Sequence, residues 1–175
     1  NTSMTGYLEV LTDPSYAGQA VVMTYPLIGN YGVCYEDMES EKAWPDGYIV
    51  REIARHPSNF RSQDSIEKFL ISNHIPGIAG VDTRALTKIL REKGTMNGMI
   101  TTNEAYDLEE VKQKIAAYKV TGVVEKVSCT EKQFFKPGDL GTSAEVNNGY
   151  KVALMDFGSK NNIVRSLLKR GTEVT

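Results

Sequence analysis

Residues 78–94 read Ile-Ala-Gly-Val-Asp-Thr-Arg-Ala-Leu-Thr-Lys-Ile-Leu-Arg-Glu-Lys-Gly, a short apolar run that leads directly into a helical pattern. Asp82 stands at the expected N-cap, where its carboxylate can accept a hydrogen bond from an early backbone amide of the helix. Gly94 supplies a residue type that commonly ends helices. Apolar residues fall on one helical face, namely Leu86, Ile89 and Leu90. The segment therefore predicts a strand followed by a helix, as in an α/β protein.

The upstream sequence continues this alternation. Residues 19–25 and 47–53 are rich in β-branched and apolar side chains and lie between turn formers, so each predicts a strand. Asp64 and Glu67 have the spacing of a capping box, which predicts a helix that ends near Asn73.

Downstream, residues 98–101 predict a further strand. Asp107 and Glu110 then repeat the capping box at the start of another helix. Its apolar residues recur at helical spacing, namely Leu108, Val111, Ile115 and Tyr118. The alternation over the first 135 residues predicts an α/β domain.

A second α/β pattern begins after a stretch of turn formers at residues 136–149, which we interpret as a linker. Residues 151–155 predict a strand, Asp156-Phe-Gly158 a turn, and Ser159 the cap of a helix that ends at Gly171. Its inward face is expected to hold Ile163, Val164, Leu167 and Leu168. With a next strand at Glu173, this is the opening βα unit of a doubly wound sheet.

Both ends of the chain look cut, because Asn1 enters a polar turn-like stretch and the strand at Glu173 has only begun. We therefore expect a domain at residues 1–135 that is incomplete at its start, and a truncated domain at 150–175. The helix after Ser159 should then lack the sheet against which its apolar face packs, and should open readily.

Composition limits the function. The chain has 175 residues, 20 basic and 22 acidic ones, and no cluster of Lys and Arg, which argues against nucleic-acid and membrane-surface partners. No apolar run approaches the ~20 residues of a membrane-spanning helix, and no signal peptide is evident, so we expect a cytoplasmic protein. Cys34 and Cys129 are far apart and outside any Cys-x-x-Cys pattern, which predicts free thiols rather than a disulfide framework or a zinc site.

Several residues invite a catalytic role, and for most of them a structural explanation is sufficient. Cys34 lies in Gly-Val-Cys-Tyr-Glu, which lacks the second glycine of a nucleophile elbow. His56 and His74 could serve it as bases, but their positions in a loop and after a helix favour solvated side chains. Asp82 is explained as an N-cap and Asp156 as part of a strand-end turn. No catalytic residue and no metal ligand is assigned.

For Ser15, too, the sequence alone favours a structural turn. In Asp13-Pro14-Ser15-Tyr16 the Asp and Pro favour a fixed turn, which can hold a short hydroxyl in one direction.

Three stretches together resemble the small subunit of carbamoyl-phosphate synthase. They are residues 1–16, which include Asn-Thr-Ser-Met-Thr-Gly-Tyr and Asp-Pro-Ser-Tyr, residues 80–88, and residues 152–163. The resemblance runs over the whole chain with the blocks in the family's order. It implies a swivelling β/β/α-type N-terminal domain, followed by the start of a class I glutamine amidotransferase domain.

The resemblance also implies a reaction. In such enzymes a Cys attacks the glutamine amide, a His acts as base and a Glu orients the His, and none of these three is expected within this chain. The ammonia passes to a large subunit that uses ATP and Mg²⁺ to make carbamoyl phosphate from bicarbonate, for arginine or pyrimidine synthesis. No phosphate-binding glycine loop occurs here, so no cofactor is expected in this chain. Ser15 matches a serine that contacts the bound glutamine.

Two other interpretations stay open. The chain could act as a non-catalytic docking module that stabilises the glutaminase and its contact with the large subunit. A free-standing hydrolase based on Cys34 would need a base and an oxyanion hole within reach of the thiol.

Overall fold

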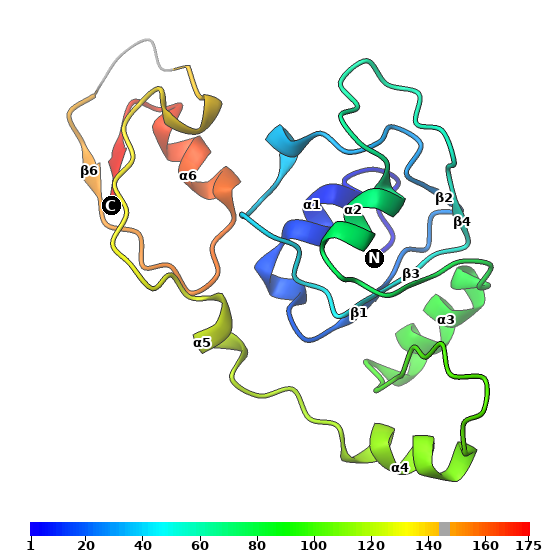
Figure 1. Ribbon diagram of the computed structural model, residues 1–175. Coiled ribbons are helices and arrows are strands. Elements are labelled where there is room, and N and C mark those ends of the chain that lie inside the picture. The colour runs from blue at the N-terminus through cyan, green and yellow to red at the C-terminus, as the bar shows by residue number, and fades with distance from the viewer. Residues whose placement is uncertain (144–147) are drawn as a thin grey trace.

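The computed structural model describes residues 1–143 and 148–175, and its strands pair in parallel (Figure 1). One sheet has the order β1-β3-β5, with strands β1 (Ala20–Val22), β3 (Gly47–Ile49) and β5 (Gly77–Ile78). A separate parallel pair is formed by β2 (Leu27–Ile28) and β4 (Glu52–Ile53). The α/β class predicted from the alternating pattern is therefore confirmed.

The main core lies where two helices pack against the three-stranded sheet. These helices are α1 (Tyr7–Thr12) and α2 (Ile66–Ser72). Their buried side chains join those of the strands in one cluster, which includes Tyr7, Leu8, Leu11, Val21, Tyr48, Ile66 and Phe69. Each fully buried side chain of this size contributes about 1.5–3 kcal/mol. This cluster holds α1, α2 and the strands together, and so fixes where the loops between them begin and end.

The two helices that come next after β5 in the chain are capped as predicted. In α3 (Thr83–Lys93), Asp82 Oδ1 accepts a hydrogen bond from Ala85 N at 3.0 Å, and Gly94 ends the helix with φ 82°. In α4 (Leu108–Ala117), Asp107 Oδ1 accepts from Glu110 N at 2.9 Å. No residue of α4 is fully buried, however: Val111 and Ile115 of its apolar stripe are half-buried, whereas Leu108 and Tyr118 are exposed. A short helix, α5 (Val123–Val127), follows.

Several predicted boundaries are wrong. Residues 98–101 form no strand, and the Ile100 side chain instead packs on Gly47, where a Cβ would lie 2.7 Å from its Cδ1. The strand predicted at 47–53 bends at Val50 and divides into β3 and β4, which pair with different strands. The cap of α2 is Ser65 rather than Asp64, because Ser65 Oγ accepts from Lys68 N.

The C-terminal unit, as we call residues 150–175, is a parallel βαβ arrangement. It comprises β6 (Lys151–Val152), α6 (Asn161–Leu168) and β7 (Glu173–Val174), the last at the position predicted from sequence. Val164 and Leu168 are buried against Leu154, Val174 and Phe135, whereas Ile163 is 46% exposed. The expectation that α6 would lack a surface to pack on is therefore wrong.

Phe135 provides part of that surface from outside the unit. It forms an antiparallel bridge to Val174, with N···O distances of 2.8 and 2.9 Å. Within the predicted linker, the structure has a 3₁₀ turn at Asp139–Gly141, and residues 144–147 lie outside the described ranges.

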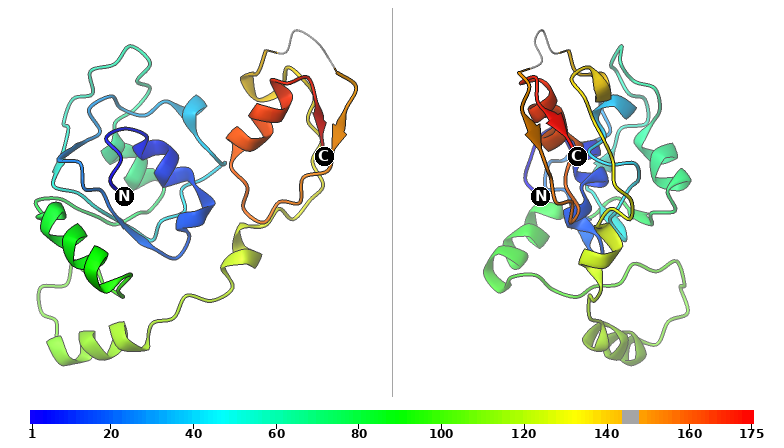
Figure 2. Two further views of the ribbon diagram at one scale, coloured as in Figure 1. Left: turned by 180° about the vertical axis from the view of Figure 1, so that it is seen from behind. Right: turned by 90° about the vertical axis from the view of Figure 1, so that its left-hand side faces the viewer.

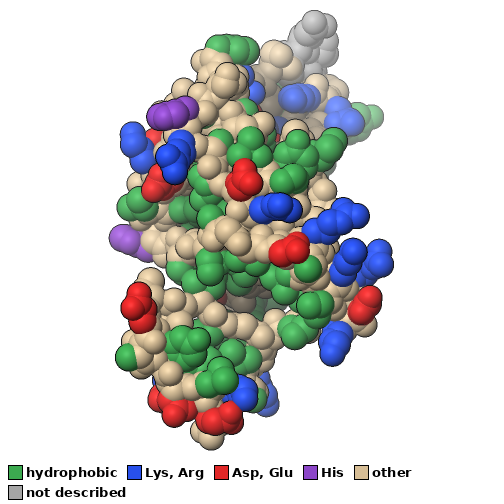
Figure 3. All heavy atoms as spheres, turned by 90° about the vertical axis from the view of Figure 1, so that its right-hand side faces the viewer, with side chains coloured by type: hydrophobic (Ala, Val, Ile, Leu, Met, Phe, Trp, Pro, Cys, Tyr) green, Lys and Arg blue, Asp and Glu red, His purple; other side chains and the backbone are tan. Residues whose placement is uncertain are grey.

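Figures 1 and 2 show the C-terminal unit beside the body that contains α1 and α2, and α4 at the lower end of the molecule. Figure 3 shows a face on which hydrophobic side chains gather beside a hollow above that lower part. Exposed apolar residues along α3, α4 and the segments around them include Ile78, Ile89, Met96, Met99, Leu108 and Tyr118.

Candidate functional site

Ser15 lies in a turn that is fixed by its backbone. The Ser15 turn, as we call Asp13–Tyr16, continues α1 as a short 3₁₀ helix with Pro14 at its first position. Asp13 Oδ1 accepts from Ser15 N at 2.9 Å, and the Ser15 carbonyl accepts from Gln19 Nε2 at 2.8 Å. Asp13 and Pro14 are buried, while Ser15 is exposed. The turn therefore presents the Ser15 hydroxyl at the surface from a constrained backbone, as the sequence predicts.

The second oxygen of Asp13 ties this turn to the C-terminal unit. Lys160 Nζ lies 2.8 Å from Asp13 Oδ2, and the Asp13 side chain is only 9% exposed. The hydrogen bond to Asp13 raises the pKa of Lys160. One carboxylate thus holds Ser15 with one oxygen and a lysine of the other part of the chain with the other.

The turn after β6 also touches the Ser15 turn. Asp156 Oδ1 accepts from Gly158 N and Ser159 N at 2.8 and 2.6 Å, which confirms the predicted turn. The strand predicted at 151–155 is shorter than expected, because β6 ends at Val152. Gly158 has φ 99°, and a Cβ there would lie 3.2 Å from Pro14 Cβ and 2.7 Å from Val127 Cγ2. Only glycine combines this backbone with so close an approach.

The helix cap predicted at Ser159 is wrong. Lys160 is the N-cap residue of α6, and its side chain does not cap the helix. The Ser159 amide is already held by Asp156, which places its side chain outside the capping position. Glu39 supplies the partners instead: its carbonyl accepts from Asn161 N at 2.7 Å and its Oε2 from Asn162 N at 2.9 Å.

A charged hollow of about 710 Å³ lies beside the contact between α6 and the loop after β2. Its carboxylates are those of Glu9, Glu36, Asp37 and Glu39, and its cations are Arg61, Arg165 and Lys169. Burial raises the pKa of Glu9, and the charges of Asp37 and Glu39 raise it further. The carboxylates belong to the N-terminal part of the chain, and Arg165 and Lys169 belong to the C-terminal unit, so charges of opposite sign face each other where these two parts meet.

Cys34 is placed without a base. The thiol is buried, and Arg61 Nη2 lies 3.1 Å from Sγ. A guanidinium stays protonated in proteins and cannot accept a proton from the thiol. His56 and His74 are both exposed, and Cys129 is an exposed thiol. The structure thus does not assemble the pair that a Cys34 hydrolase would require.

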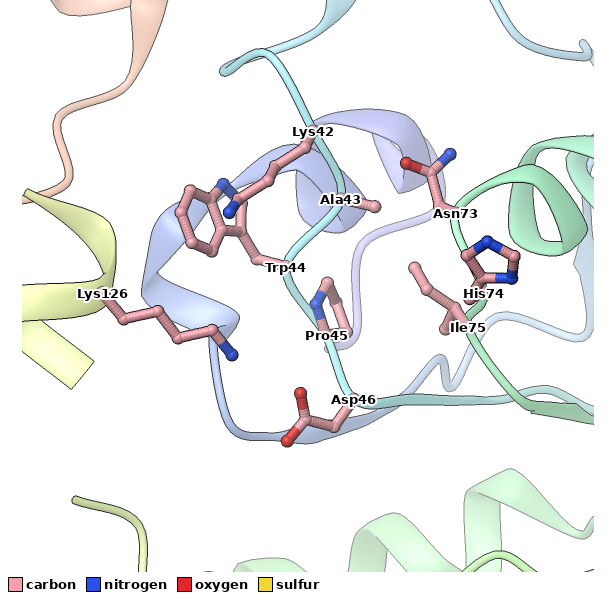
Figure 4. Close-up of a pocket in the computed structure, with 9 residues that line it drawn as sticks. All are labelled: Lys42, Ala43, Trp44, Pro45, Asp46, Asn73, His74, Ile75 and Lys126. Carbon is pink, nitrogen blue, oxygen red and sulfur yellow. The ribbon is translucent and has the colours of Figure 1, made fainter. Parts of the chain in front are cut away.

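A second hollow, of about 340 Å³, lies between the loop before β3 and the end of α2 (Figure 4). Lys42 Nζ lies 4.2 Å from the centroid of the Trp44 ring, and Lys126 reaches toward the same hollow from α5. His74 is on the opposite wall. Trp44 is therefore already covered by a cation of the chain itself.

Within the described ranges, no group of three or more His, Cys, Asp or Glu side chains is arranged to hold a metal ion. None of the helices in these ranges combines the length and apolar character that crossing a bilayer requires.

The structure defines an α/β protein in which a second parallel unit docks on a rigid serine turn of the first. Residues 1–100 match the family described as carbamoyl-phosphate synthase small chain, CPSase domain. The chain belongs to this family, as the sequence resemblance predicts.

Three similar curated proteins, each a carbamoyl phosphate synthase small chain, show how much of the family's length this chain covers. The one from Clostridium perfringens is 50% identical over 175 residues, which are 100% of this chain and 47% of the relative. That of Aquifex aeolicus is 45% identical over 181 residues, 99% of this chain and 48% of the relative. That of Listeria innocua is 45% identical over 176 residues, with shares of 100% and 46%. The chain spans about half the length of these relatives.

Sequence reasoning missed the residues that surround Ser15 in space. Lys160, Glu39 and Arg165 are far from Ser15 along the chain, and no local pattern marks them as its neighbours. One available signal was the cluster of polar residues that opens α6, which lacks a side-chain cap of its own. Helix α1 was not predicted either, although Tyr7, Leu8 and Leu11 have helical spacing.

Proposed function

We propose that this chain is part of the glutamine-hydrolysing small subunit of carbamoyl-phosphate synthase and that it contributes a substrate contact rather than the catalytic groups. The nucleophilic Cys, its His and the orienting Glu would lie in a part of the small subunit outside residues 1–175. Family membership and the share of the relatives that the chain covers support this division.

The domains are proposed as follows. Residues 1–135 form the N-terminal, swivelling β/β/α-type domain, residues 136–149 a linker, and residues 150–175 the beginning of a class I glutamine amidotransferase domain. The parallel βαβ arrangement of β6, α6 and β7 is compatible with the opening unit of a doubly wound sheet.

Ser15 is proposed to contact the glutamine substrate. The observation that supports this role best is the geometry of the Ser15 turn, in which Asp13 fixes the Ser15 backbone and pairs with Lys160. The Ser15 backbone is therefore fixed beside the C-terminal unit, with its side chain exposed. Such a hydroxyl can donate to a substrate carboxylate or carbonyl, or accept from its ammonium group.

The proposed partner is the large subunit, which would receive ammonia and use ATP and Mg²⁺ to make carbamoyl phosphate from bicarbonate, in the cytoplasm. A docking role for the chain is a second candidate. Leu108 at the start of α4 and Tyr118 at its C-cap favour it, because both are exposed and exposed apolar surface often marks protein contacts.

The test of the substrate contact is Ser15→Ala in the complete small subunit assembled with its large subunit. The variant loses one hydrogen bond to glutamine, for which about 0.5–3 kcal/mol is expected. Steady-state kinetics should therefore show a raised KM for glutamine with a smaller change in kcat, the pattern of lost ground-state binding. Activity with free ammonia should be unchanged, because that route bypasses the glutamine site.

The matched control is Ser72→Ala, which removes an exposed serine from the end of α2. It should leave glutamine kinetics at the wild-type values. The proposed contact is wrong if Ser15→Ala behaves like this control in a folded protein. It is also wrong if the ammonia-dependent reaction falls equally, which would indicate a structural turn.

A further inference from the structure

The first amides of α6 are hydrogen-bonded by Glu39, a residue distant from α6 in sequence. The first amides of a helix have no partner within it, and a carboxylate there is favoured by the helix dipole. Glu39 accepts hydrogen bonds from Asn161 and Asn162 with its backbone carbonyl and its side chain. Because Ser159 is held in the preceding turn, α6 depends on Glu39 for this cap.

Arg165, on the same face of α6, donates hydrogen bonds from its side chain to backbone carbonyls of the loop that contains Glu39. Its Nη1 donates to the carbonyl of Met38 at 3.2 Å, and its Nη2 donates to that of Glu36 at 3.1 Å. A planar guanidinium that donates to two separate carbonyls fixes orientation as well as distance. Residues 36–39 therefore hold α6 at its first residues and again one turn later.

These contacts determine where Lys160 lies. Lys160 directly precedes α6, so a shift or rotation of the helix would move its ammonium away from Asp13. Asp13 is also the residue that holds the Ser15 amide. The chain of contacts runs from Glu39 and Arg165 through α6 and Lys160 to the Ser15 turn.

We infer that Glu39 and Arg165 are positioning residues for glutamine use: they set α6 against the Ser15 turn, and thereby set the place of the Ser15 hydroxyl in the assembled site. This inference rests on the proposed function of Ser15. Neither residue touches the substrate, and their effect on it is transmitted through the Ser15 turn.

The experiment uses the complete small subunit together with its large subunit. Glu39→Ala and Arg165→Ala should each raise the KM for glutamine by roughly 2- to 30-fold, the range that corresponds to loss of one helix cap or of a comparable hydrogen-bonded contact. The change in kcat should be smaller, and the ammonia-dependent rate should stay at the wild-type value. Glu39→Gln keeps an acceptor for Asn162 N and should restore most of the affinity.

Two exposed residues nearby give matched controls. Arg170→Ala removes an arginine whose Nη1 bonds to Ser166 within its own segment, and Glu41→Ala removes a carboxylate two residues from Glu39. Both should leave the KM for glutamine unchanged. A similar rise in either control would overturn the inference, because general surface charge would then explain the effect.

A double-mutant cycle separates positioning from general loss of structure. When combined with Ser15→Ala, Glu39→Ala should add little to the KM, since the contact it positions is already gone. Full additivity, or a parallel loss of ammonia-dependent activity, would contradict the inference. If Ser15→Ala alone has no effect, the proposed function fails. If it raises the KM while Glu39→Ala and Arg165→Ala do not, only the positioning role fails.

Discussion

At the level of single residues, His74 shows a backbone conformation that its side chain does not favour. It follows α2 with φ 55°, its amide donates to Ile71 O at 3.0 Å, and Ile75 N donates to Leu70 O at 2.9 Å. These bonds form a Schellman motif, in which the residue at the position of His74 is usually glycine. A left-handed conformation costs about 1–2 kcal/mol for a residue with a Cβ.

His74→Gly should therefore raise the free energy of unfolding by up to about 1 kcal/mol, after subtracting the greater entropy of glycine in the unfolded chain. Urea denaturation followed by circular dichroism would measure it. His74→Ala keeps the Cβ and should give no such gain. If the two variants change stability equally, contacts of the imidazole rather than backbone strain determine its contribution.

Of the four helix N-caps predicted from sequence, those at Asp82 and Asp107 are confirmed and those at Asp64 and Ser159 are wrong. Asp82 and Asp107 cap their helices as expected, because an N-cap depends only on the residues that immediately follow it. The cap predicted at Ser159 is wrong because the local sequence does not decide it. The Ser159 amide is bound within the turn before α6, and Glu39 caps the helix instead. The bond from Asn162 to Glu39 spans 123 residues of sequence, so the partner cannot be identified from the residues around the helix start.

At the level of elements, the helices differ in how much of their surface is covered. Ile66, Phe69 and Leu70 of α2 are buried in the main core, and α6 buries Val164 and Leu168, whereas α4 has no buried residue. Isolated helices of about ten residues are marginal in water, so packing decides which of them persist.

Hydrogen exchange of the assembled and the free small subunit should reflect this order. The amides of α4 should exchange far faster than those of α2, with α6 between them, because local opening exposes little new apolar surface in α4. Addition of the large subunit should slow α4 if its exposed apolar face is a docking surface. Equal protection of α4 and α2 in the free subunit would contradict the interpretation that α4 has little packing support.

Strands were the elements for which sequence reasoning was least accurate. The run at residues 47–53 was read as one strand, yet its two halves belong to different sheets, and residues 98–101 pair with nothing. A strand exists only where a partner is available, and the partner is chosen by the global fold rather than by the run itself.

At the level of the whole molecule, the two α/β patterns in the sequence correspond to two parallel arrangements in the structure, which meet at the Ser15 turn and α6. Periodicity predicted both patterns, and the family resemblance singled out Ser15. Neither could reveal that Asp13, Lys160, Glu39 and Arg165 form one set of contacts, because those contacts depend on how the two parts pack.

The bridge between Phe135 and Val174 has a consequence for the length of the chain that lies between the two parts. Asn148 N also donates to the carbonyl of Gly171 at 2.9 Å, so Phe135 and Asn148, which flank residues 136–147, are both hydrogen-bonded to the surroundings of β7. Residues added between them need not disturb these bonds.

Added residues there should consequently cost only loop entropy, about 0.6 kcal/mol for a doubling of length. Six Gly and Ser residues inserted after Ser143 should lower the free energy of unfolding by less than this amount, as measured by urea denaturation. The same insertion after Gly158 would separate Asp156 from Ser159 and should destabilise the protein far more. The segment before β6 is thus where this chain can grow or shrink while Ser15 and Lys160 keep their places.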